Sequence, residues 1–319
     1  MKNSFQKLMG LAFLAFIAFS CQNFQEETPV MNQPTPDEIV ENTDPNARKG
    51  NFPEYGAFLI GTEEVPSVAS PGSGAARITQ VDGNTLKFEI RVANTTGIIF
   101  AHLHNAPAGT NGGVVVTLIP TQSPSPLSNG LIAEGTINSS MLTGSLAGKT
   151  IADLVRELEM GKIYVNVHTS ANRGGELRGQ VSIIQANDNK SYDAKLSGAN
   201  EVPSVLSSGT GVAKFNFSTD GMAASFHVNV NGITDVRFAH IHFAKAGVNG
   251  GVVYNLRMDK VNGPVSGLYA QGEILPMNFS GQLRGGDLFI LREAFRTGNA
   301  YVNLHTDKFP GGELRGQVN

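Results

Sequence analysis

Six of the seven histidines of this chain fall into two matching sets of three. The members of the two sets, 137 or 138 residues apart, are His102, His104 and His168, and His240, His242 and His305. Three imidazoles on a rigid scaffold can supply three nitrogen ligands to zinc or copper and leave a further position for water or another ligand. The histidines therefore predict a candidate metal site, Zn or Cu, in each half of the chain.

The spacing of these residues indicates that each set lies on one face of a sheet. His102 and His104 are two apart, and residues two apart on a strand share a face. Asn166 with His168, and Glu176 with Arg178, follow the same rule. If the three strands are neighbours, their polar residues form one patch. We expect the members other than histidine to be metal-supporting or structural polar residues: Asn166, Glu176 and Arg178, then Asn303, Glu313 and Arg315.

A structural interpretation of the same residues stays open at this point. An imidazole can donate to a backbone carbonyl and accept from an arginine or asparagine, which would satisfy a buried polar layer without metal. Glu176 and Arg178 could likewise anchor the last strand as an ion pair. The seventh histidine, His227, is predicted to lie on the solvent face of its strand.

The histidine sets belong to an internal duplication. Glu64-Val-Pro-Ser-Val68 recurs as Glu201-Val-Pro-Ser-Val205, and a Gly-Gly-Glu-Leu-Arg-Gly-Gln phrase ends both copies, each at an offset of 137 residues. A period of this length exceeds that of solenoid repeats and matches the usual size of a domain. We predict two domains, at residues 55–185 and 192–319, joined by a polar linker at 186–191.

The N-terminus predicts export. Two lysines precede an apolar run from Leu8 to Phe19, which is too short to span a bilayer and is typical of a signal peptide. The only cysteine, Cys21, follows directly after this segment. Residues 1–20 therefore resemble a bacterial lipoprotein signal peptide, with Cys21 as the lipidation site; an ordinary signal peptide with an incidental cysteine is the alternative. We expect an exported protein of the bacterial cell envelope, lipid-anchored, in the outer membrane.

Composition restricts the remaining functions. Residues 21–54 are rich in Pro, Asn, Thr and acidic residues and are predicted to be a disordered tether. A net charge of −3 gives no basic footprint for nucleic acid. The expected partners are the membrane, through the N-terminal lipid, and an unidentified envelope or extracellular protein or glycan.

Both copies show the patterns of short strands. Leu86, Phe88, Ile90 and Val92 alternate with polar residues, as on a half-buried strand. One segment per copy has helical spacing instead, at Ile151–Leu158 and Leu288–Phe295, each followed by a glycine. We predict a mainly β fold of two tandem antiparallel sandwich or barrel domains, Greek-key-like, each with one short helix. The other predicted strands of the first copy are 57–60, 74–80, 98–104, 114–119, 132–137, 163–168 and 176–183.

Four motifs in one order, present twice, give the chain a resemblance to tandem CHRD domains, a module named for chordin. In the first copy they are Glu64-Val-Pro, Ala101-His-Leu-His104 with Asn111-Gly-Gly-Val-Val115, Tyr164-Val-Asn-Val-His168-Thr and Gly175-Glu-Leu-Arg-Gly-Gln180. The resemblance covers nearly everything after the tether. It implies an extracellular β-rich module. In chordin the module belongs to a protein that binds growth factors, but nothing in this sequence suggests a growth factor as the ligand.

A catalytic function is not indicated by the sequence. No nucleophile stands at a readable spacing from a base, and the chain has no phosphate loop or cofactor fingerprint. A His-x-His pair and a third strand histidine also occur in the Greek-key sandwich of copper-zinc superoxide dismutase. A similarity of fold alone does not establish a common function. This chain lacks that enzyme's further ligands and its disulfide, which argues against superoxide dismutation.

Three functions remain open from the sequence. We favour a lipid-anchored, non-catalytic binding or adhesion module at the cell envelope, in which tandem domains provide avidity. The alternatives are an envelope protein that binds Zn or Cu through a three-histidine site in each domain, and a purely structural envelope component.

Overall fold

The computed structural model describes residues 52–185 and 191–319. The predicted signal peptide, Cys21, most of the predicted tether and linker residues 186–190 lie outside the described residues. Within the described ranges, no helix has the length and apolar character needed to cross a membrane.

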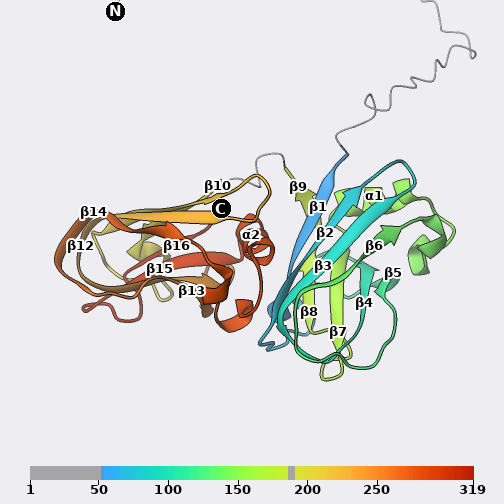
Figure 1. The fold of residues 1–319 in the computed structure, drawn as a ribbon, viewed down its shortest axis with the longest axis horizontal. Coiled ribbons are helices and arrows are strands. Elements are labelled where there is room, and N and C mark those ends of the chain that lie inside the picture. Colours follow the sequence, from blue (N-terminus) through green and yellow to red (C-terminus); the bar gives the residue numbers. More distant parts are fainter. Residues whose placement is uncertain (1–51, 186–190) are drawn as a thin grey trace, which may run out of the picture. The chain divides into compact units, whose positions relative to one another are not determined.

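Domain 1 consists of nine strands and one α-helix (Figure 1). The elements in chain order are β1 (Glu54–Ile60), β2 (Ser73–Gln80), β3 (Leu86–Thr95), β4 (Ile98–Asn105), β5 (Gly113–Ile119), β6 (Ser128–Ile137), α1 (Ile151–Glu159), β7 (Ile163–Thr169), β8 (Leu177–Gln180) and β9 (Ser182–Ile184). Short 3₁₀ turns lie at Gly61–Glu63, Ser139–Met141 and Gly144–Leu146.

The strands of domain 1 form one antiparallel sheet in the order β5-β4-β7-β8-β1-β2-β3-β6, with β9 paired to β1. β8 and β1 are joined at a single residue pair, Arg178 with Ile60. The sheet thus consists of two halves, β5-β4-β7-β8 and β1-β2-β3-β6. The chain crosses between the halves from β3 to β4, where Asn94 and Gly97 have φ of +51° and +73°.

Alternation along the strands places the core between the two halves. Leu103 and Val165 from one half and Leu59 and Ile90 from the other are fully buried in one hydrophobic cluster. Each histidine position alternates with these core residues, so the histidines lie on the outer face of the β4-β7-β8 half. Burial of polar residues on that face therefore depends on the loops that cover it.

Domain 2 repeats this arrangement with seven strands and one α-helix. Its elements are β10 (Ser191–Ser197), β11 (Thr210–Phe217), β12 (Ala224–Phe243), β13 (Gly251–Arg257), β14 (Val261–Glu273), α2 (Leu288–Arg296), β15 (Ala300–Thr306) and β16 (Leu314–Gln317), with 3₁₀ turns at Gly198–Asn200, Pro276–Asn278 and Gly281–Leu283. The strand order is β11-β10-β16-β15-β12-β13, and β11 and β14 also pair with β12.

One long strand distinguishes domain 2. β12 spans the region that β3 and β4 occupy in domain 1, and its register shifts at several points, near Asp235 among others, where φ is +52°. The extra residue of the second copy lies in the preceding turn, which has six residues (218–223) where domain 1 has five (81–85).

The two helices form where the sequence spacing predicts them. α1 starts with a capping box between Thr150 and Asp153 and buries Ile151, Leu154 and Leu158. α2 starts at Asp287, whose side chain accepts from the backbone N–H of Ile290. Both are followed by a glycine with positive φ, at +65° and +64°, which suits a helix C-terminus.

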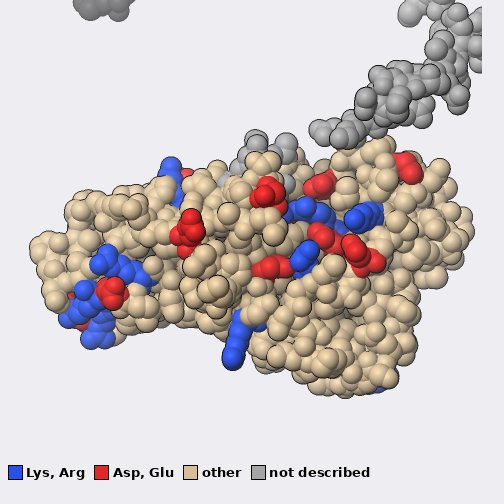
Figure 2. Space-filling view, viewed as in Figure 1, with Lys and Arg blue, Asp and Glu red and all other residues tan. Residues whose placement is uncertain are grey.

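The predicted fold class, mainly β with two tandem domains and one short helix in each, is confirmed. One predicted strand is wrong in detail: 176–183 is broken into β8 and β9 between Gln180 and Ser182, and Glu176 precedes β8. On the face that Figure 2 shows, the described Lys and Arg side chains are interspersed with Asp and Glu.

Candidate metal centre in each domain

In each domain the three predicted ligands are brought together by the pairing of two strands. β4 pairs with β7 so that His102 faces Asn166 and His104 faces Tyr164, while His168 faces Phe100. One nitrogen from each of His102, His104 and His168 lies within 4.8 Å of those from the other two.

Domain 2 repeats the cluster with the same pairing between β12 and β15. His240 faces Asn303 and His305 faces Phe238. One nitrogen from each of the histidines of this set, His240, His242 and His305, again lies within 4.8 Å of the others.

Backbone carbonyls fix the tautomer of two histidines per domain. Nδ1 of His104 is 3.0 Å from the carbonyl oxygen of Gly112, and Nδ1 of His168 is 3.0 Å from that of Arg173. A carbonyl only accepts, so each Nδ1 must carry the proton and each neutral ring has a lone pair on Nε2. His242 and His305 make the same bonds, also at 3.0 Å, to Gly250 and Pro310.

One nitrogen of each histidine in the cluster is buried without a hydrogen-bond partner. In domain 1 they are Nδ1 of His102 and Nε2 of His104 and of His168. In domain 2 the same atoms are left in His240, His242 and His305. Buried polar atoms in native proteins are nearly always partnered, so three such atoms together make the cluster a candidate ligand site. The structural interpretation predicted arginine or asparagine donors at these positions, and the described residues supply none.

Burial keeps the imidazoles neutral. Desolvation, with a smaller contribution from His104, lowers the pKa of His102 to about 4. Burial also lowers the pKa of His168 to about 4, against the opposing effect of its hydrogen bond to Arg173. In domain 2 burial lowers the pKa of His240 and of His242 to about 4 as well. Neutral imidazole is the form that binds metal.

Loops make the outer face of the sheet a buried layer. Arg178, only 2 % exposed, donates to Oδ1 of Asn111 at 3.0 Å and to the carbonyl of Thr110 at 2.7 Å. Its guanidinium also lies 3.6 Å from the centre of the Tyr164 ring. Arg178 thus secures the loop that carries Gly112, whose carbonyl orients His104. Arg315 holds the corresponding loop of domain 2 through Asn249 and Val248.

Glu176 has a different role from the one considered for it. Its carboxylate accepts hydrogen bonds from Ser70 at 2.8 Å, Thr169 at 2.6 Å and Asn172 at 3.2 Å. An ion pair with Arg178 is not formed: in the described part of the chain, no nitrogen of Arg178 lies within 4.0 Å of a carboxylate. Glu313 likewise accepts from Ser207 and Thr306.

Sequence reasoning assigned no role to Glu64, which the structure places in the same layer. Glu64 is 6 % exposed, and one of its oxygens accepts from Nδ2 of Asn166 at 3.3 Å. Glu201 makes the same contact with Asn303. The recurrence of Glu-Val-Pro in both copies was the available signal, but it does not say what the carboxyl contacts.

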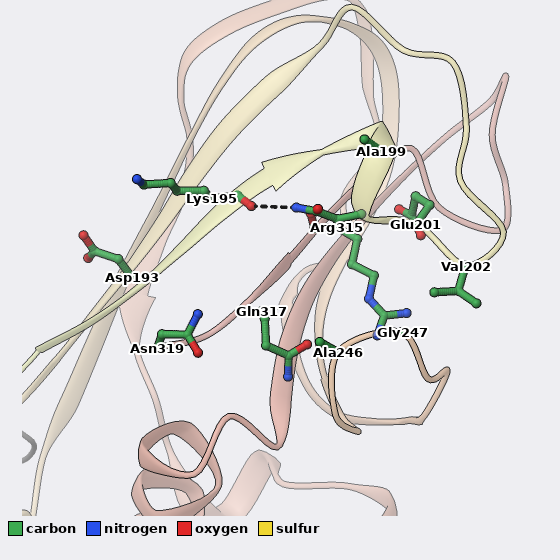
Figure 3. Close-up of a pocket in the computed structure, with 11 residues that line it drawn as sticks. Asp193, Lys195, Ala199, Glu201, Val202, Ala246, Gly247, Arg315, Gln317 and Asn319 are labelled. Carbon is green, nitrogen blue, oxygen red and sulfur yellow. Dashed lines mark hydrogen bonds between the residues drawn. The ribbon is translucent and has the colours of Figure 1, made fainter.

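A groove of about 650 Å³ lies beside the polar layer of domain 2 (Figure 3). Glu201 and Arg315 belong to both the groove and the polar layer. The other side chains that give the groove its polar character are Asp193, Lys195, Asn200, Gln317 and Asn319.

The repeated cluster coincides with a family match in both halves of the chain. The model of the CHRD domain matches residues 55–181 and again 192–318. The chain belongs to the CHRD domain family. Each matched CHRD domain contains one complete set of three histidines. A search of curated proteins found no match to this chain.

Proposed function

We propose that this protein is an exported, lipid-anchored envelope protein in which each CHRD domain binds one transition-metal ion through three histidines. The observation that carries the proposal is the clustering of three histidines in both domains, with one nitrogen of each within 4.8 Å of the others and one nitrogen of each buried without a partner. The anchor rests on the signal-like N-terminus and Cys21, and the metal site rests on geometry.

Electrostatics supports a cation at the centre of each cluster. Two of the three rings have their protons committed to backbone carbonyls, so the lone pairs of their Nε2 atoms are buried without a donor. Buried lone pairs without a donor are unfavourable, and protonating a ring is opposed by burial. A metal ion would accept all three lone pairs at once.

The donor set favours Zn or Cu. Imidazole nitrogen is a good ligand for both, whereas Mg and Ca prefer oxygen. Metal–nitrogen distances of roughly 2.0–2.1 Å bring the ligand nitrogens to about 3–4 Å of each other. The observed limit of 4.8 Å requires a closure of about 1 Å, which a side-chain rotation can supply. Hydrogen bonds from the far nitrogen of a metal-binding histidine to a carbonyl are the usual means of orienting it, and they are already present here.

The test is metal stoichiometry of the untagged protein after chelation and reloading with zinc or with copper. We expect two ions per chain, one for the His104→Ala or the His242→Ala variant, and none for the double variant. His227→Ala is the matched control, because His227 belongs to neither cluster, and it should keep two ions. Two tightly bound ions in the double variant, or none in the wild type, would contradict the proposal.

The domain 2 groove favours a second function, binding of a polar envelope ligand such as a glycan. Its lining offers amides and charges of both signs, which suit hydroxyl-rich ligands. Lys195→Glu and Asn319→Ala should reduce binding to an envelope polysaccharide without changing metal content. Equal polysaccharide binding by wild type and both variants would remove this candidate.

A further inference from the structure

Glu64 and Glu201, which occupy equivalent positions in the two domains, are buried carboxyl groups that lack a donor on one side. Glu64 and Glu201 are 6 % and 7 % exposed, and Oε1 of each is buried without a hydrogen-bond partner. An ionised carboxylate has about four sites that accept hydrogen bonds, so a single weak donor leaves it poorly compensated. The contrast with Glu176, which accepts from three donors, lies within the same polar layer.

The asparagine beside each glutamate also has a buried oxygen without a hydrogen-bond partner. Nδ2 of Asn166 donates to Oε2 of Glu64 at 3.3 Å, but Oδ1 of Asn166 is buried without a partner. Nδ2 of Asn303 donates to Glu201 at the same distance, and its Oδ1 is likewise without a partner.

The two unpartnered oxygens are neighbours. In domain 1, Oε1 of Glu64 and Oδ1 of Asn166 both lie 2.5 Å from the position that a Cβ on Gly175 would occupy. In domain 2 the equivalent oxygens of Glu201 and Asn303 both lie 2.6 Å from that position on Gly312. Turning the amide over would exchange its two ends and leave an acceptor facing an acceptor.

One proton resolves this conflict in each domain. We propose that the carboxyl groups of Glu64 and Glu201 are protonated in the folded protein and that each forms a cyclic acid–amide pair with its asparagine. The carboxyl O–H donates to Oδ1 of the asparagine while Nδ2 donates to the other carboxyl oxygen. Both unpartnered oxygens are then satisfied.

The charges around Glu64 do not replace this proton. Arg178 faces the carboxyl and favours its ionisation, but its guanidinium donates to Asn111 and Thr110 and lies over Tyr164. The charge of Glu176 opposes this ionisation. Burial outweighs the arginine and raises the pKa of Glu64 to about 7. Burial likewise raises the pKa of Glu201 to about 7, against Arg315 and Asn303.

Each pair acts as a pH-sensitive lock on the loop that contains it. Glu64 precedes Val65, whose carbonyl accepts from Nδ2 of Asn111, so this loop connects to the segment that orients His104. Loss of the proton sets a carboxylate against Oδ1 of Asn166 and weakens the attachment of the loop. In domain 2 the groove gives solvent protons a route to this layer, because Glu201 lines it (Figure 3). Neither residue of the acid–amide pair belongs to a histidine cluster.

The direct test is titration of the metal-free chain with its glutamate carboxyl carbons labelled with ¹³C. We expect two resonances with midpoints near pH 7, of which Glu64→Gln removes one and Glu201→Gln the other. An infrared band of protonated carboxyl groups should persist in the wild type at pH 6 and vanish by pH 8.5, which requires no variant. Midpoints at or below pH 5 for all glutamates, with no such band at pH 6, would overturn the proposal.

Stability of the variants gives a second readout. A glutamine resembles the protonated acid, since its amide N–H can donate to Oδ1 of the asparagine. The folded pKa is raised from 4.5, so the stabilisation by Glu64 is complete below pH 4.5 and is lost as the pH rises through 7. Glu64→Gln should avoid this loss and become more stable than wild type above pH 7. Glu176→Gln is the control and should be less stable at every pH above 5, because it gives up an acceptor that three donors use. A Glu64→Gln variant as destabilised as Glu176→Gln would show that Glu64 is ionised.

Discussion

His104 and Tyr164 are stacked almost parallel, with ring centroids 4.9 Å apart and an interplanar angle of 8°. His242 and Tyr301 repeat the relationship at 4.8 Å and 11°. The tyrosine hydroxyl also accepts from the backbone N–H of Gly112 at 3.1 Å, and Gly112 in turn supplies the carbonyl that binds His104. A single tyrosine therefore holds both the plane of the imidazole and the peptide that sets its tautomer.

Replacing this hydroxyl should weaken metal binding without removing a ligand. Tyr164→Phe keeps the stacked ring but frees the Gly112 peptide, and changes of this kind beside metal ligands lower affinity by roughly 10–100-fold. Zinc titration against a chelating indicator, performed in the His242→Ala background so that one site remains, measures the effect. Tyr269→Phe, in the same background, is the control, because Tyr269 contacts Arg257 rather than a histidine. Equal affinities for the two phenylalanine variants would show that the tyrosine does not position the site.

Acid should destabilise the metal-free protein well above the pH at which most carboxylates titrate. Four histidines, His102, His168, His240 and His242, have a folded pKa of about 4 against 6.5. The unfolded chain therefore binds more protons between pH 4 and 6.5, and stability falls as the pH drops through that window. Each group contributes about 3 kcal/mol at most, from ~1.4 kcal/mol per pKa unit. Protonation of Glu64 and Glu201 raises the stability as the pH falls, but the four histidines have the larger combined effect.

Urea unfolding of the chelated protein at several pH values checks this expectation. The free energy of unfolding should decrease by several kcal/mol from pH 6.5 to pH 4, and alanine at His102 and His240 should make the decrease smaller. A free energy that stays level across this range would mean that the imidazoles are not buried in solution.

A methyl group at Gly175 should be poorly tolerated. Its φ is +137°, and an added Cβ would lie 2.5 Å from atoms of Asn166 and Glu64. Strain in this region costs about 1–3 kcal/mol before any steric clash, so Gly175→Ala should lose at least about 2 kcal/mol of stability. Thermal unfolding compares it with Gly174→Ala, where a Cβ meets nothing within 4 Å. Similar losses for the two variants would contradict the close contact at Gly175.

Cys21→Ser tests the membrane anchor. If Cys21 is lipidated, the native protein should partition into detergent and incorporate labelled fatty acid, and the serine variant should do neither. A single acyl chain holds a protein only weakly, so retention is expected to depend on more than one chain at this residue. Equal partitioning and processing of the two proteins would rule the anchor out.

Period-two alternation was sufficient to locate most strands and the faces of their residues. Leu103 and Val165 point into the core and the histidines away from it, as the spacing predicts. Pairing between β4 and β7 was not deducible, but the assumption that they are neighbours brought the right residues together. The break at Val181 has no signature in the pattern, since Val181 is a buried apolar residue that continues the alternation from Leu177.

The hydrogen-bond partners of the buried carboxyl groups could not be predicted from the sequence. Ser70 lies 106 residues from Glu176 along the chain, and Glu64 lies 102 residues from Asn166. Such contacts depend on where loops cross the outer face of the sheet. Strand periodicity says nothing about that path. The ion pair between Glu176 and Arg178, which the structural interpretation left open, is not formed in the described residues.

The carbonyls that orient His168 and His305 belong to residues of unlike chemistry. His168 is held by the carbonyl of Arg173, and His305 by that of Pro310. A main-chain carbonyl therefore orients each of these two imidazoles, and the side chain of the residue that supplies the carbonyl differs between the domains. The side chains of these two loops can therefore differ in charge and size between the domains, while the histidine cluster beneath each loop keeps the same arrangement. The two domains can thus differ on the surface of these loops and still orient their histidines in the same way. A comparison of residue types alone would miss this shared main-chain hydrogen bond.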